Sequence, residues 1–409
     1  MTVSPFLDLA GAVPAADDAA DPGVPAHYGN PLTEQRRLDE GAAVVDLSTR
    51  GVISVSGADR LTWLDSMTSQ SLRSLPAGRP AEALLLDPAG HIEHALHVID
   101  DGETTWLLVE HADTDAVLDF LQKMRFMLRV EPADRTADFA TVGSIGEPDA
   151  LTSLAATSNG IRLAWRDPWP SVVEGGHQYA RQGRPQPAAP GAASDAASAH
   201  PGSSYRWVET LVPRDSLGAL AAEAASGALS VAGTLAAEAL RVAAWRPRLA
   251  AEVDERSIPH ELDWLRTAVH LDKGCYRGQE TVAKVHNLGH PPRRLVFLHL
   301  DGSEGIQVPA GAEVLAGDAV AGRVTSSAVH HELGPVALAV VKRSTDPSAD
   351  LVVRTQDGLV AAAQETIVPT DAGAEAHVPR IPRLGAVTRD GAVTRDSAVK
   401  REPRDSTAE

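Results

Sequence analysis

Residues 272–280 read DKGCYRGQE and hold the one cysteine among the 409 residues of the chain. Lys273 and Arg277 stand two positions before and after Cys275, and nearby cations favour the thiolate, which is the reactive form of the side chain. The two glycines let the backbone bend where a larger residue would clash. The residues alone leave two interpretations open: an activated thiol in a tight, partly exposed turn, and an inert, buried cysteine.

Residues 273–280 match the motif K-G-C-Y-x-G-Q-E, with Arg277 at the variable position. This motif resembles the signature of the YgfZ-type folate-binding proteins, relatives of the glycine-cleavage T-protein (aminomethyltransferase) that assist iron–sulfur cluster assembly. The similarity extends from about His27 to about Val368 and includes residues 239–242, 258–261, 281–285 and 322–327. The resemblance implies an α+β fold, in which a folate-binding body of two α+β subdomains with antiparallel sheets is joined to a small C-terminal antiparallel β-barrel.

The resemblance also implies a cofactor, tetrahydrofolate or a one-carbon derivative, and a set of site residues. Cys275 is the expected functional thiol. The expected cofactor-binding residues are Lys273, Tyr276, Arg277, Gln279, Glu280 and Arg241, the last on a helix that lines the folate cavity in the family.

Each of these residues has a plainer interpretation that the sequence leaves open. Lys273 and Arg277 either activate the thiol, bind the acidic glutamate tail of a folate, or are solvated surface charges. Tyr276 either stacks on a ring or fills the core. Gln279 and Glu280 either pair with the edge of a pterin or cap a helix.

Two positions depart from the aminomethyltransferase pattern. That family has a pterin-contacting glutamate two residues after the arginine, where this chain has Ala243. It has a catalytic aspartate after the glycine of the second hairpin, whereas residues 90–96 read GHIEHAL and contain Glu93 and His94 but no aspartate. Since a transferase needs a group that assists proton transfer, the sequence favours the YgfZ branch.

The leading hypothesis is therefore a folate-binding protein that supports iron–sulfur cluster assembly or repair in client enzymes through Cys275, with an indirect effect on tRNA modification. The alternative is a tetrahydrofolate-dependent aminomethyl transferase with a substitute acid such as Glu93. A third possibility is a folate-sensing scaffold without chemistry, so the sequence does not decide whether the protein is an enzyme. The expected partners are folate and iron–sulfur client or assembly proteins.

Composition excludes several other classes. A net charge of −18 argues against direct nucleic-acid binding, which needs a basic face. A single cysteine excludes an intrachain disulfide, and no histidine spacing matches a zinc template, so we expect no metal site. The chain has no run of ~20 apolar residues and no basic leader, which predicts a cytoplasmic protein without membrane segments.

Local patterns predict the domain organisation. Residues 81–86, 91–99 and 104–109 predict strands, the first two joined by a β-turn at 87–90. We expect disorder in residues 1–25, an aminomethyltransferase-like body over 26–290 with a disordered insert at 181–204, and a barrel over 291–368. Residues 369–409 are polar and repetitive, which predicts a disordered, low-complexity tail.

Overall fold

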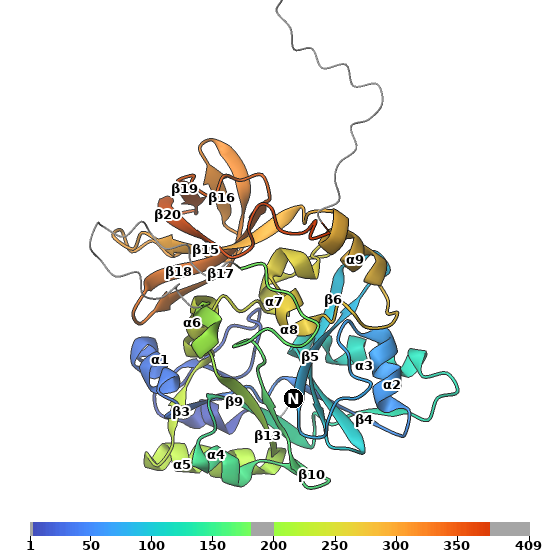
Figure 1. Cartoon of the computed structure of the whole chain (residues 1–409). Helices are drawn as coiled ribbons and strands as arrows, with labels where there is room; N and C mark the ends of the chain where they lie inside the picture. Colours follow the sequence, from blue (N-terminus) through green and yellow to red (C-terminus); the bar gives the residue numbers. More distant parts are fainter. Residues whose placement is uncertain (1–2, 181–199, 377–409) are drawn as a thin grey trace, which may run out of the picture.

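The computed structural model describes residues 3–180 and 200–376. Within these ranges the chain forms three units: two five-stranded sheets with covering helices, and a closed six-stranded barrel (Figure 1). The predicted α+β class and C-terminal antiparallel barrel are confirmed. No helix among the described residues is long and apolar enough to cross a membrane.

The first unit is an antiparallel sheet in the order β5-β6-β7-β4-β8. Its strands are β4 (Gly51–Ser56), β5 (Pro80–Leu86), β6 (Ile92–Asp100), β7 (Thr104–Val109) and β8 (Glu131–Asp134). Side chains alternate along β6: Leu96 and Val98 enter a cluster with residues of α2 (Arg60–Met67) and α3 (Thr114–Met124), whereas Ala95 and Ile99 face the centre of the molecule. The central face of β6 thus belongs to the site described below.

The second unit is a sheet in the order β12-β13-β9-β3-β14, in which only β14 and β3 pair in parallel. Its strands are β3 (Ala43–Asp46), β9 (Phe139–Ile145), β12 (Ala164–Arg166), β13 (Trp207–Pro213) and β14 (Ser230–Ala232). The associated helices are α1 (Pro31–Asp39), α4 (Asp149–Leu154), α5 (Leu217–Ser226) and α6 (Thr234–Ala243). Asn30 caps α1 by accepting a hydrogen bond from the backbone of Thr33 (3.1 Å), and Pro31 follows at a position where its missing N–H costs nothing.

The third unit is the barrel β15-β18-β17-β16-β19-β20, closed by pairing of β15 with β20. Its strands are β15 (Arg293–Leu300), β16 (Glu313–Ala316), β17 (Ala319–His330), β18 (Gly334–Lys342), β19 (Leu351–Arg354) and β20 (Leu359–Thr366). The connection to it contains α7 (Leu249–Glu252), α8 (Leu265–Ala268) and α9 (Gln279–Leu288). The short elements are β1 (Val13–Pro14), β2 (Pro25–His27), β10 (Thr157–Ser158), β11 (Ile161–Arg162) and the 3-10 turns Pro5–Asp8, His111–Asp113, Pro201–Ser204, Arg214–Ser216 and Pro259–Leu262.

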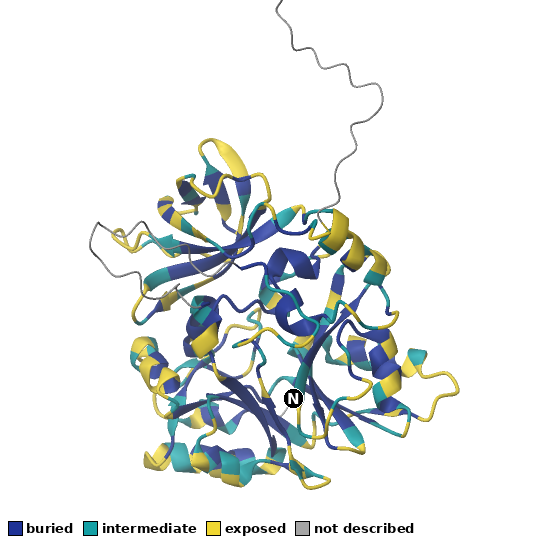
Figure 2. Cartoon of the chain, viewed as in Figure 1, coloured by how far each residue is buried: buried dark blue, intermediate teal, exposed yellow. Residues whose placement is uncertain are grey.

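The largest apolar cluster joins all three units, since it contains Leu86 from the first sheet, Trp207 from the second and Phe297 from the barrel. Figure 2 shows the strands largely buried and the exposed residues gathered on the outer helices and loops. Burial of this shared core holds the units as one body, and the polar site lies within it.

The N-terminal segment differs from the disorder expected for residues 1–25. Phe6 is fully buried in the cluster around α5, β1 pairs with β2, and Asp21 is 3% exposed in an ion pair with Arg50. The composition of residues 1–25 did not reveal this order, because it depends on two side chains, Phe6 and Asp21, whose partners lie far away in the sequence.

The predicted disorder of the insert and the tail falls largely on residues 181–199 and 377–409, which lie outside the described residues. At the edges of those ranges, Pro201–Ser204 forms a 3-10 turn. Residues 374–376 hydrogen-bond to carbonyl groups at the end of α9.

Candidate functional site

A cavity of about 60 Å³, here called the central cavity, is lined by residues of the first and second units and of the segment that leads to the barrel. Its aromatic wall comes from Tyr205, Trp207 and Trp264. Its charged and polar residues are Arg50, His97, Glu110, Asp167, Glu209, Glu238, Arg241, Arg246 and Arg248. These residues come from β6, β13, α6 and the segments beside them, so the cavity exists only in the folded protein.

The half-buried His97 and the buried Glu209 form an acid–base pair in this cavity. The His97 ring stacks on Trp165 with centroids 3.6 Å apart, and its Nδ1 lies 2.8 Å from Glu209 Oε2. Trp207 Nε1 donates to Glu209 Oε1 (3.1 Å), and Arg50 also donates to that oxygen. Burial raises the pKa of Glu209, but the charges of His97 and Arg50 outweigh it and hold the pKa well below its usual range. Glu209 is therefore an ionised carboxylate at neutral pH.

A second carboxylate site lies beside Trp264. Arg246 donates from Nη2 to Glu82 Oε1 (2.6 Å) and from Nε to Asp167 Oδ2 (2.9 Å). Glu82 also accepts from Trp264 Nε1 (2.9 Å) and from the Thr267 hydroxyl (2.6 Å). Burial raises the pKa of both carboxyl groups. For Glu82 the charge of Arg246 outweighs burial, so that its pKa is lowered from the usual value. For Asp167 burial dominates and its pKa stays raised. One guanidinium group thus joins the first sheet to the second.

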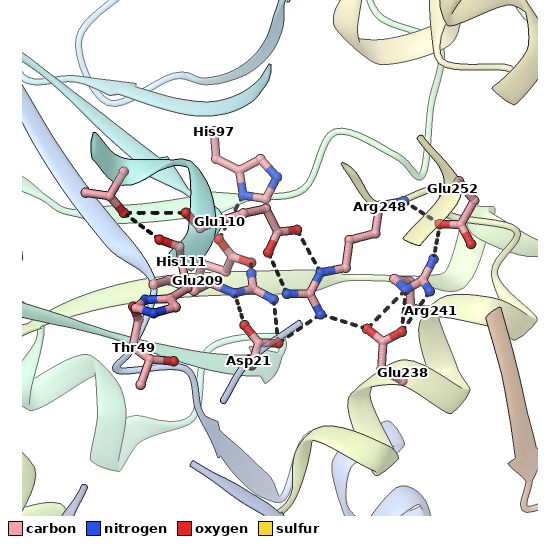
Figure 3. Close-up of polar contacts among 12 residues, drawn as sticks. Asp21, Thr49, His97, Glu110, His111, Glu209, Glu238, Arg241, Arg248 and Glu252 are labelled. Atoms are coloured by element: carbon pink, nitrogen blue, oxygen red, sulfur yellow. Dashed lines mark hydrogen bonds and ion pairs between the residues drawn. The ribbon is translucent and has the colours of Figure 1, made fainter. Parts of the chain in front are cut away.

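Arg241, the cofactor-binding residue predicted on α6, lines the central cavity but is saturated by protein groups. Its Nη1 donates to Glu252 (2.9 Å) and to the carbonyl of Arg246 (2.6 Å), and its Nη2 donates to Glu238 and to the Ser326 hydroxyl (both 2.7 Å). Figure 3 shows its contacts with Glu238 and Glu252 as part of a row of ion pairs that continues through Arg248. In this state Arg241 ties α6 to α7 and to the barrel.

The central cavity suits a pterin by chemistry but not by volume. An ionised carboxylate, an imidazole and aromatic walls are the groups that a polar heterocycle pairs with and stacks on. A cavity of about 150 Å³ holds a benzene ring, whereas this one measures about 60 Å³. A bicyclic ring therefore does not fit until some ion-paired side chains move.

Cys275 lies outside this cavity, on residues 272–278, here called the cysteine loop. The thiol is exposed, and a Cβ at Gly274 would meet nothing within 4 Å. Gly278 has φ +82° and would bring a Cβ within 2.6 Å of the Asp87 carbonyl, so only glycine fits there. The loop thus presents its sulfur to solvent and turns sharply into α9.

Lys273 anchors the cysteine loop. Its Nζ donates to the carbonyls of Asp65 (2.6 Å), Thr68 (2.8 Å) and Gln70 (2.6 Å), and the side chain is 3% exposed. Burial lowers its pKa, opposed by the charge of Asp65. The ammonium group of Lys273 therefore does not contact the thiol or face a ligand site as predicted, because its three N–H groups donate to backbone carbonyls.

Arg277 pairs with Glu93 (2.8 and 3.3 Å) and lies over the ring of Phe120. Glu93, the substitute acid considered for a transferase, is thereby a surface residue and does not line the central cavity. The reason is a β-bulge: Leu85 pairs with His94 and Leu86 with Ile92, which leaves Glu93 as the extra residue between two pairs.

The other predicted residues separate into two places. Tyr276 and Gln279 line a second cavity of about 220 Å³ on α9, together with His286, and the Lys273 Nζ lies 5.3 Å from the Tyr276 ring. Glu280 is exposed on α9. The structure therefore groups Lys273, Tyr276 and Gln279 around the cysteine loop, and places Arg241 in the central cavity.

Replacing Lys273 with methionine is expected to lower the free energy of unfolding by about 2–3 kcal/mol, because three carbonyls lose a charged donor. Amide hydrogen exchange in the cysteine loop should also become faster. Lys284→Met on the exposed face of α9 is the matched control and should change neither value. Unchanged exchange in the loop of the Lys273 variant would contradict the anchoring role.

Sequence reasoning missed His97, Glu209, Arg50, Arg246 and Arg248. The one usable signal was the alternation of β6, which places His97 on the same face as Ala95. The partners of these residues lie 159 and 164 positions apart for Arg50–Glu209 and Arg246–Glu82, beyond any local pattern.

Comparison with known proteins agrees with this architecture. Residues 24–167 match the family model of the GCVT N-terminal domain, and residues 293–369 match that of the glycine cleavage T-protein C-terminal barrel domain. A chloroplastic protein of Arabidopsis thaliana named as a transferase is 25% identical over 302 residues, which cover 72% of this chain and 64% of that protein. The match thus spans less than two thirds of that relative's length.

Two further similarities concern aminomethyltransferases. The enzyme of Streptomyces avermitilis is 28% identical over 334 residues, covering 79% of this chain and 84% of the relative. The crystal structure of glycine cleavage system aminomethyltransferase T from Bartonella henselae superposes with a TM-score of 0.67 at 19% identity, covering 89% of this chain and 96% of that one, which shows a shared fold. The matches to both domains of the glycine cleavage T-protein, over residues 24–167 and 293–369, show that the chain belongs to the superfamily of that protein.

Proposed function

We propose that this protein binds a reduced folate, tetrahydrofolate or a one-carbon derivative, in its central cavity. We further propose that it supports assembly or repair of iron–sulfur clusters in client enzymes of the cytoplasm, as the YgfZ branch of the superfamily does. The observation that carries this proposal is the separation of two sites: a polar, aromatic cavity at the centre, and an exposed thiol on an anchored loop outside it.

The folate half of the proposal rests on the chemistry of the central cavity. Glu209 is ionised, and it lies beside His97 and Trp207. A carboxylate can accept two hydrogen bonds from the amino and ring N–H groups of a pterin, and the indole supplies a flat apolar wall. Such a ligand requires the cavity to widen beyond its present 60 Å³.

The thiol half rests on exposure and anchoring. Cys275 is exposed, while Lys273 and Gly278 fix the loop on both sides of it. A sulfur in this position is open to a protein partner and can exchange with, or transiently ligate, an iron site on a client. An effect on tRNA modification would then be indirect, through clients that modify tRNA.

A deletion strain tests the proposal. Loss of the gene should lower the specific activity of a [4Fe–4S] tRNA-modifying enzyme without changing the amount of its polypeptide, and the full chain supplied from a plasmid should restore it. Equal enzyme activity in the deletion and parent strains would contradict a role in cluster assembly or repair.

A one-carbon transferase is the second candidate, and His97 with Glu209 is the observation that favours it. The pair supplies a proton-transfer group inside the central cavity. Glu93, the substitute acid suggested by the sequence, does not line that cavity. Tetrahydrofolate-dependent turnover by the purified protein would support this candidate. Folate binding without turnover, together with slow labelling of Cys275 by a thiol reagent, would instead favour a non-catalytic folate-sensing scaffold.

A further inference from the structure

Residues 9–23, here called the strap, cross the protein between two apolar anchors. Phe6 before the strap and Val24 after it are fully buried. Within the strap only Ala15 and Asp21 are buried, and the Ala15 amide donates to the Val24 carbonyl (2.8 Å). Asp21 is therefore the one charged side chain of the strap that is buried, and it lies near the C-terminal end of the strap.

Asp21 bridges two arginines. Its Oδ1 accepts from Arg50 Nε (3.0 Å), and its Oδ2 lies 2.8 Å from Arg248 Nη1 (Figure 3). Burial raises the pKa of Asp21, but Arg248 and Arg50 outweigh it and hold the pKa well below its usual range. The other guanidinium nitrogens have acceptors as well: Arg50 Nη1 donates to Glu209, Arg50 Nη2 lies 3.4 Å from Asp21 Oδ2, and Arg248 donates from Nε and Nη2 to Glu110. With the strap docked, every nitrogen of both guanidinium groups has a carboxylate acceptor.

Arg50 and Arg248 line the central cavity, whereas Asp21 does not. The strap thus contacts two residues of the cavity wall, Arg50 and Arg248, through the carboxylate of Asp21, which does not itself line the cavity. A ligand carboxylate that approached these arginines would have to join Asp21, Glu209 and Glu110 in a buried space. Like charges at such distances disfavour one another strongly, so a ligand carboxylate and Asp21 compete for the same donors.

We propose that Arg50 and Arg248 form a carboxylate-binding subsite of the central cavity, and that the strap keeps this subsite occupied through Asp21 until an anionic ligand displaces it. The inference rests on the proposed function for the identity of the ligand, a reduced folate whose glutamate tail carries the carboxylates. It moves the acidic-tail site from Lys273 and Arg277, which are engaged elsewhere, to two arginines that the sequence did not single out.

The geometry makes exchange feasible. The strap has few buried side chains, so its opening costs less than unfolding of the core. Its departure leaves Arg50 paired with Glu209 and Arg248 paired with Glu110 and Glu238, so neither cation is left without a partner. Because linkage is reciprocal, a ligand that releases the strap binds more tightly when the strap is weakened.

Calorimetric titration of the full chain tests this with Asp21→Asn and, as matched control, Asp18→Asn at an exposed position of the same strap. The probes are 5-formyltetrahydrofolate, p-aminobenzoylglutamate, which lacks the pterin, and 6-methyltetrahydropterin, which lacks carboxylates. We expect Asp21→Asn to bind the first two about 10-fold more tightly and the third unchanged. In the wild type, 5-formyltetrahydrofolate should speed amide exchange in the strap, a readout that does not depend on the variant.

The outcomes separate the two proposals. If 5-formyltetrahydrofolate binds the wild type and Asp21→Asn equally and strap exchange does not change, the subsite proposal is wrong and folate binding stands. If p-aminobenzoylglutamate binds Asp21→Asn more tightly than the wild type, but 5-formyltetrahydrofolate binds no more tightly than p-aminobenzoylglutamate, the subsite stands and the folate function is wrong. If no probe binds Asp21→Asn, both are wrong.

Discussion

Replacement of Arg246 by methionine is expected to lower the free energy of unfolding by about 3–5 kcal/mol, as removal of one partner from a buried ion pair does. Arg246 is 4% exposed and pairs with Glu82, on β5 of the first sheet, and with Asp167, directly after β12 of the second sheet. Without the guanidinium group, two carboxylates lie in the core with no cation between them. The loss is larger than that of an apolar contact because the charges left behind keep their desolvation penalty.

Urea unfolding at pH 7 measures this effect, with Arg256→Met, an exposed position, as the matched control. The lowered pKa of Glu82 gives the expected pH dependence. A carboxyl whose pKa is depressed by folding stabilises the protein above its unfolded pKa and loses that contribution as pH falls through its folded pKa. The difference between wild type and Arg246→Met should therefore shrink below a pH of about 4. A difference under about 1 kcal/mol at pH 7 would show that the pair contributes little net stability.

Replacement of Cys275 by alanine should reduce complementation of the deletion strain to the level of the empty plasmid. The thiol is the only one in the chain, so no neighbouring sulfur can replace it. Because Cys275 is exposed on the cysteine loop, its removal leaves no cavity, and stability should stay within about 0.5 kcal/mol of the wild type. A functional loss would thus report on the sulfur and not on the fold.

Two companion variants make this result specific. Cys275→Ser keeps the size of the side chain but not its metal affinity or redox chemistry, and should fail like alanine. Ser303→Ala, on an exposed turn of the barrel, should complement fully. Full client activity with Cys275→Ala would remove the thiol from the mechanism.

The sequence predicted those parts of the fold that local patterns control. The strand at 104–109 coincides with β7, and the turn at 87–90 lies between β5 and β6, with Gly90 at φ +86°. The small C-terminal antiparallel barrel, which the family resemblance implied, is present as β15 to β20. Period-2 alternation and turn residues act within a few positions, so a single sequence is enough to find them.

The candidate site was harder to predict because its contacts are long-range. The cysteine motif indicated a partly exposed thiol, but it did not reveal the partners of the flanking cations. Lys273 donates to carbonyl groups at the end of α2, and Arg277 pairs with Glu93. The bulge that turns Glu93 outward depends on how β5 pairs with β6, which no residue of β6 reveals. Asp21 looked like one of several acidic residues in an unstructured terminus, since its arginines are distant in sequence.

The most direct test of the central claim is a calorimetric titration of the full chain with 5-formyltetrahydrofolate, repeated on Glu209→Gln and Cys275→Ala. A ligand in the central cavity predicts one site per chain, affinity about 10-fold weaker in Glu209→Gln, and unchanged affinity in Cys275→Ala. Binding that is lost with the thiol and unaffected at Glu209, or no binding to the wild type at all, would contradict a folate site in the central cavity.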